Sequence, residues 1–189
     1  MLASARCGRR KMEMMQTRDK LLQYSKEELV DLIELYAKDS LALDGVWFQS
    51  VEKESGMDAA ILHDRNAWER FTVVEAQRIK RFLGLPEHPG LEGLAKALQL
   101  RFNAHVVEAD TVLEEDRLVY TIRYCRVQAA RERKGMPYHP CKPVGLVEYA
   151  GFGKAIDERI SCRCLSCYPD IEDESCCCSW EYRLTKTEE

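Results

Sequence analysis

The chain has 189 residues, of which 46% are hydrophobic and 32% are charged, and its formal net charge is −4. This length and composition are typical of one globular domain with a buried core, and they exclude a chain that is mainly disordered. No stretch approaches the roughly 18 apolar residues that a membrane span needs. Because the balance of charge is acidic, we also expect no binding to nucleic acid.

The first twenty residues differ from the rest in charge. Residues 1–20 carry six basic and two acidic side chains and have no apolar stretch of the kind found in secretory signals. We therefore expect a cytoplasmic protein in which residues 1–20 form a disordered basic extension and residues 21–189 form a single domain.

Helix signals dominate the next eighty residues. Ser25 and Glu28 have the spacing of a capping box, which predicts a helix start. The spacing of apolar residues then predicts a short helix from Asp44 to near Gly56. It predicts two more helices, over 57–83 and over about 91–102.

The pattern changes after residue 103. Alternating residues predict a β-hairpin with strands near 105–109 and 118–124 and turn material between them. Two further helices and two further strands are expected, at 126–134, 143–156, 160–164 and 177–184. The fold class is thus α+β, with a helical region (about 21–102) packed on an antiparallel sheet (about 103–185) that carries a cysteine-rich metal site.

The chemistry is concentrated in the cysteines, of which 7 of the 9 lie after residue 140. In a cytoplasmic protein such clusters are more often metal ligands than disulfides. We predict a tetrahedral zinc site formed by Cys141, Cys164, Cys167 and Cys178, with an iron–sulfur cluster or simple burial of small thiols as alternatives. Strand alternation places Cys178 with Trp180 on the apolar side and leaves Cys176 and Cys162 as reserve ligands.

Aromatic residues of the helical region are candidates for a ligand pocket. Trp47, Phe48, Trp68 and Phe71 could line it, although core packing explains the same spacing. Arg126 could bind a carboxylate of the ligand, although a basic run of this kind is more often a solvated helix face.

Four side chains are candidates for catalysis. Asp44, His63 and Glu69 lie among the aromatic residues and could do acid–base work, and Cys125 beside a cation could be a nucleophile. Each also has a structural explanation, as a solvated surface group or a buried thiol.

Several segments resemble known families. Cys125, Cys141 with the following segment 143–149, the Cys164–Cys167 step and segment 178–182 resemble the 4-vinyl-reductase-type domain. This resemblance implies an α+β small-molecule-binding module with a zinc site at Cys141, Cys164, Cys167 and Cys178. The chain departs from the related sensors in having Cys164 where they carry an acidic ligand.

Segments 44–48, 67–71, 125–128 and 141–145 are similar to a group of bacterial and archaeal cytosolic proteins that includes the L-2-amino-thiazoline-4-carboxylic acid hydrolases. From these resemblances we expect a small-molecule-binding domain with a structural Cys₄ zinc, its ligand held between helices and sheet. The alternatives are a hydrolase of a small C–N heterocycle and an iron–sulfur redox protein. The sequence is compatible with a homodimer but does not determine the oligomeric state.

Overall fold

One sheet of four antiparallel strands organises the fold, in the order β1-β2-β4-β3. The computed structural model describes residues 17–185. In chain order its elements are α2 (Lys26–Phe82), α3 (Gly90–Leu98), β1 (Glu108–Leu113), β2 (Leu118–Tyr124), α4 (Arg126–Arg133), α5 (Lys142–Ile156), β3 (Ile160–Cys167) and β4 (Cys178–Leu184). The expected α+β class is confirmed, whereas residues 1–16 of the predicted basic extension lie outside the described residues.

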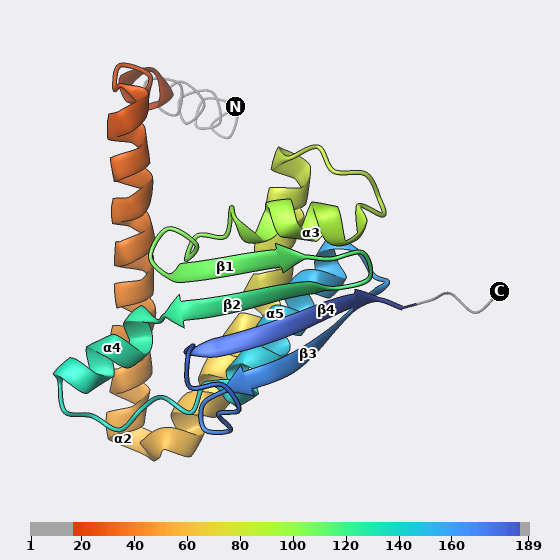
Figure 1. Cartoon of the computed structure of the whole chain (residues 1–189). Coiled ribbons are helices and arrows are strands. Elements are labelled where there is room, and N and C mark those ends of the chain that lie inside the picture. The colour runs from red at the N-terminus through yellow and green to blue at the C-terminus, as the bar shows by residue number, and fades with distance from the viewer. Residues whose placement is uncertain (1–16, 186–189) are drawn as a thin grey trace, which may run out of the picture.

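Helix α2 is one long helix broken into two arms at Gly56. Gly56 has φ 85° and ψ 171°, a backbone conformation open to glycine but strained for other residues. The first arm (26–55) stands beside the sheet and extends past it, and the second arm (57–82) turns back behind the sheet (Figure 1). The expected break near Gly56 is confirmed, but the short helix predicted from Asp44 is part of the first arm.

The start of α2 has the predicted capping box. Ser25 Oγ accepts from the backbone N–H of Glu28 at 3.1 Å, and the Glu28 carboxylate accepts from the backbone N–H of Ser25 at 2.8 Å. Two N–H groups without helical partners are thereby satisfied. Within residues 17–185 no helix is both long and apolar enough to cross a membrane.

Helix α5 is the layer that covers the inner face of the sheet. The second arm of α2 packs mainly against α5 rather than against the strands, so the helical region reaches the sheet largely through α5 and α3. Gly145 allows the close approach of α5, because a Cβ at this position would lie 2.6 Å from a ring carbon of Trp180. The centre of the core lies between these layers and includes Leu94, Leu98, Leu118, Phe152, Ile156 and Tyr182.

Some predicted boundaries are wrong. Helix α3 ends at Leu98 rather than near 102, because the Glu75 carboxylate accepts from the backbone N–H of Phe102 and the chain then forms turns. Strand β1 begins at Glu108 and runs through expected turn residues to Leu113. The turn itself is closed by the bond from the N–H of Glu114 to the carbonyl of Arg117.

The outer face of the sheet is polar, as strand alternation predicts for β4, but it is not open to water there. Glu181 is buried because three arginines cover its carboxylate: Arg163 at 3.0 Å, Arg183 at 3.2 Å and Arg117 at 3.7 Å. Opposite charges thus allow a carboxylate to be buried on the face where alternation predicts a solvated one.

Candidate functional site

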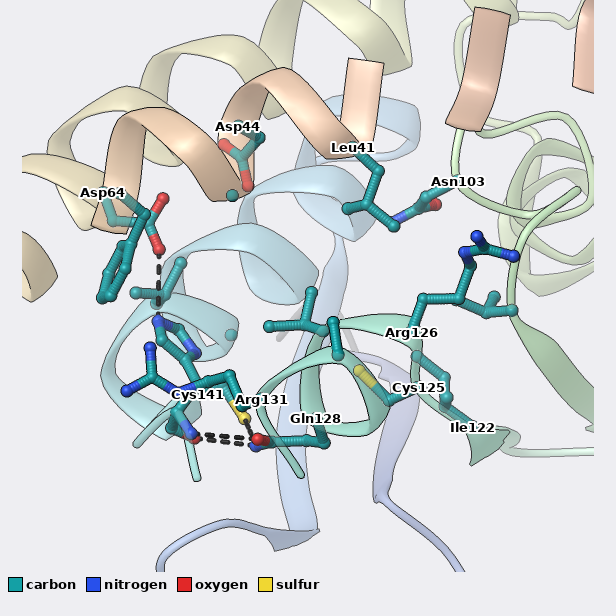
Figure 2. Close-up of a pocket in the computed structure, with 18 of the residues that line it drawn as sticks. Leu41, Asp44, Asp64, Asn103, Ile122, Cys125, Arg126, Gln128, Arg131 and Cys141 are labelled. Atoms are coloured by element: carbon teal, nitrogen blue, oxygen red, sulfur yellow. Dashed lines mark hydrogen bonds and ion pairs between the residues drawn. The ribbon is translucent and has the colours of Figure 1, made fainter. Parts of the chain in front are cut away.

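A cavity of about 370 Å³ lies between the two arms of α2, the helices α4 and α5, and the inner face of the sheet. In the close-up, Asp44 enters it from the first arm and Asp64 from the second, while Cys125 and Arg126 lie across from them where α4 begins (Figure 2). This volume is that of a pocket for a small organic molecule.

Aromatic rings form much of the cavity wall. They are contributed by both arms of α2, by α5 and by β4: Phe48, Trp68, Tyr149 and Trp180. Of the four aromatic residues predicted for a ligand pocket, Phe48 and Trp68 thus line this cavity. The other two lie outside the lining, with Trp47 52% exposed and Phe71 40% exposed, because their positions on α2 face away from α5.

Carboxylates gather at the buried end of the cavity. Asp44, Asp64 and Glu148 all line it, and Asp64 and Glu148 are buried. The pKa of Asp64 is raised to about 7, first by burial and then by the nearby charge of Asp44, while His139 and a hydrogen bond from Trp68 act in the opposite direction. Burial likewise raises the pKa of Asp44 and of Glu148 above their usual values.

One buried arginine forms ion pairs with two acidic groups behind the cavity. Arg101 is 1% exposed, and its guanidinium lies 2.7 Å from Glu148 and 3.0 Å from Glu75. It also lies against the rings of Trp68, Tyr149 and Phe152, where the guanidinium carbon is 4.8–5.9 Å from the ring centres. The ion pairs and rings compensate for the desolvation of this charge and join α2, α5 and the segment after α3.

A thiol, an imidazole and a carboxylate follow one another along the cavity wall. Cys141 lies at the N-terminus of α5, hydrogen-bonded to His139, whose Nε2 is 3.6 Å from Asp64 Oδ2. The Gln128 amide donates to the carbonyl of His139 at 2.8 Å and lies 3.6 Å from the Cys141 sulfur. A hydrogen bond from Cys167, and then His139, hold the pKa of Cys141 well below its usual value.

The predicted metal-binding cysteines come together in part. Cys141 Sγ and Cys167 Sγ are 3.7 Å apart, and Cys167 pairs with Cys178 across β3 and β4 and is hydrogen-bonded to it. Cys164 precedes a register shift in β3 and is only partly buried. Within residues 17–185, no group of three or more His, Cys, Asp and Glu side chains is arranged to hold a metal ion.

The remaining predicted site residues divide into two sets. Cys125 and Arg126 line the cavity with Asp44, but burial raises the pKa of Cys125 to about 12, so its thiol is not activated. His63 and Glu69 are exposed on the second arm and do not line the cavity.

Sequence reasoning missed the buried polar residues Asp64, Glu148 and Arg101. A signal existed for Asp64, which lies four residues before Trp68 and therefore on the same face of a helix. None existed for Arg101, because its partners come from distant parts of the chain.

A family model described as "Family of unknown function (DUF6125)" matches residues 20–184. No curated protein matches the chain.

Proposed function

Because the chain belongs to DUF6125, a family of unknown function, we propose a function from the geometry of its own cavity: it is a small-molecule-binding domain. The observation that carries this proposal is the cavity of about 370 Å³ between helices and sheet. Aromatic rings form much of its lining, and carboxylates lie at its buried end. Ligand pockets are typically concave and mostly apolar, with a few polar groups that orient the ligand. The lining of this cavity likewise combines apolar and aromatic side chains with a few polar groups.

Gly45 offers a direct test, because it lines the cavity and a Cβ at this position would meet no atom within 4 Å. In Gly45→Leu the new side chain would occupy the cavity, and the first arm would gain helix propensity. We expect the neutral dye prodan to bind the wild-type chain with a blue shift in its fluorescence, and Gly45→Leu to lose most of that signal.

The matched control is Ala67→Leu, which adds the same side chain at an exposed position of the second arm. It should bind the dye as the wild type does. Equal binding by Gly45→Leu and Ala67→Leu, or no binding to the wild type, would contradict the proposal.

We further infer that the predicted zinc ion is structural, held by Cys141, Cys167 and Cys178 with Cys164. A tetrahedral zinc with Zn–S bonds of about 2.3 Å separates its sulfur ligands by about 3.8 Å. The 3.7 Å between the sulfurs of Cys141 and Cys167 fits this value. The thiols of Cys164 and Cys178 would have to turn toward this pair.

A hydrolase is the second candidate, and the series Cys141, His139 and Asp64 favours it. In such a reaction the Cys141 thiolate attacks the carbonyl carbon of a ring C–N bond, His139 protonates the departing nitrogen, and water then cleaves the thioester and restores the thiol. Asp64 would orient the imidazole. A thiolate held in a closed structural zinc site reacts slowly with electrophiles, so zinc content and rapid alkylation of Cys141 by iodoacetamide distinguish the two candidates.

A further inference from the structure

The buried end of the cavity contains more acidic than basic groups. Glu75 and Glu148 share the single charge of Arg101. Asp44 and Asp64 have no lysine or arginine partner among the ion pairs of residues 17–185, and the basic group beside Asp64 is His139. An uncompensated carboxylate is costly to bury, so this end of the cavity favours a positive charge brought by a ligand.

Asp64 also lacks hydrogen-bond donors. Its side chain is 8% exposed, and a carboxylate can accept about four hydrogen bonds. The one indole N–H of Trp68 is shared between Asp64 and Asp44. His139 Nε2 at 3.6 Å is beyond normal hydrogen-bond distance. The carboxylate of Asp64 therefore has acceptor positions that a ligand bearing several N–H groups would satisfy.

The walls around these carboxylates suit the same kind of ligand. Phe48, Trp68, Tyr149 and Trp180 present aromatic rings to the cavity. Organic ammonium groups bind favourably against the faces of such rings, and the attraction is stronger where water is excluded. Carboxylates and rings therefore favour a cation over a neutral or anionic group.

We propose that the buried end of the cavity binds the ammonium group of an organic amine, with Asp44 and Asp64 accepting its N–H bonds and the aromatic rings packing around its carbon atoms. This inference rests on the proposed ligand-binding function and names the class of ligand. The buried arginine that lines the cavity, Arg131, is neutralised by an ion pair with Glu52 at 2.8 Å. The other basic lining residues, Lys38, Arg126, Arg133 and Lys134, lie in solvent. Water and salt screen their charges, so they do not determine the preference at the buried end.

Three probes of similar shape test the proposal by calorimetric titration of the full chain. Benzylamine is a cation with three N–H donors at neutral pH, benzyl alcohol is its neutral counterpart, and benzyltrimethylammonium is a cation without N–H donors. We expect benzylamine to bind the wild type at least tenfold more tightly than benzyl alcohol, and benzyltrimethylammonium to fall between them.

Asp64→Asn and Asp44→Asn each remove a charge with almost no change in shape. Either variant should weaken benzylamine binding about tenfold and leave benzyl alcohol binding unchanged, whereas the exposed Glu69→Gln should change neither. Two variants are used because Asp64 is buried and Asp44 is only partly so. If Asp64→Asn does not fold, Asp44→Asn still decides.

The outcomes separate this inference from the proposed function. Equal binding of benzylamine and benzyl alcohol would overturn the amine preference and leave a ligand-binding cavity. Binding of prodan without any binding of benzylamine would do the same. Failure of prodan and of all three benzyl probes would overturn both proposals.

Discussion

Asp64 is the residue at which the electrostatics of the cavity are most unusual. Asp44 on the first arm, Glu148 on α5 and His139 before α5 all face it, and Trp68 donates to it. Its pKa of about 7 means that the folded chain holds a proton on Asp64 at pH values where the unfolded chain has released it. Stability from this group is therefore fully present below about pH 4 and is lost as the pH rises through 7.

Asp64→Asn should remove that loss, because an amide does not ionise. Relative to the variant, the wild type should lose roughly 2–3 kcal/mol in free energy of unfolding between pH 5 and pH 8, since the loss extends over the two pH units below the pKa of about 7 and each unit corresponds to about 1.4 kcal/mol. Urea unfolding of both proteins at the two pH values measures this. Glu69→Gln should show the same pH dependence as the wild type. A constant difference between the wild type and Asp64→Asn would contradict the prediction, because it would show that the pKa of Asp64 is not raised to about 7.

At the scale of elements, the break at Gly56 decides where the first arm lies. The positive φ of Gly56 is costly for any residue with a Cβ, although a Cβ there would contact no other atom. Gly56→Ala should therefore lower the free energy of unfolding by about 1–3 kcal/mol. It should also weaken ligand binding, because Asp44 and Asp64 lie on opposite sides of the break.

The control is the same substitution at Gly45, which lies in a regular part of the first arm. There Gly45→Ala should raise stability by about 0.5–1 kcal/mol. Thermal and urea unfolding of the two variants give the comparison, and equal effects of the two substitutions would refute the role assigned to Gly56.

The thiol cluster joins two other elements, α5 and the β3–β4 hairpin. If zinc binds there, elemental analysis should find one zinc per chain and a colourless protein. Cys167→Ala should lose the metal and unfold at a markedly lower temperature, because metal binding and folding are coupled. Cys125→Ala, which removes a thiol outside the proposed ligand set, should keep its zinc. A brown, iron-containing protein would indicate an iron–sulfur cluster instead.

The sequence predicted elements better than it predicted the site. The capping box at Ser25, the helices after Tyr124 and the inward side of Cys178 were readable because caps and periodicity are local signals. The partners of Arg101 were not readable, since Glu75 and Glu148 approach it only after three elements have packed. For the same reason spacing could not show that Trp47 faces away from the cavity and Phe48 faces into it.

At the scale of the whole molecule, the first arm leaves an apolar stripe uncovered. Ile33, Tyr36, Leu43 and Trp47 are each 51–71% exposed. Their spacings of three, seven and four residues place them on one heptad seam, where Ser40 occupies the intervening position. We infer from this uncovered stripe a contact with a second copy of the chain, because a stripe of this kind can pair with itself across a two-fold axis.

We therefore expect the chain to sediment as a dimer at micromolar concentration. Leu43→Glu should shift it to monomer, because the charge would be buried at the seam, while Lys53→Glu at an exposed position of the same arm should not. Sedimentation velocity measures the oligomeric state of each protein, and a wild-type monomer at tens of micromolar would contradict the prediction.

The break in α2 makes the geometry of the cavity depend on the number of residues on either side of Gly56. Asp44 and Asp64 lie on the two arms of one helix that folds back on itself at Gly56, so their meeting depends on how many residues separate each from Gly56. Each residue turns a helix by about 100°, so deleting one between Asp44 and Gly56 would aim Asp44 away from the cavity. Inserting seven would nearly restore its direction but would shift it along the axis by about 10 Å. The spacing between these two carboxylates is thus as much a determinant of the cavity as their identity.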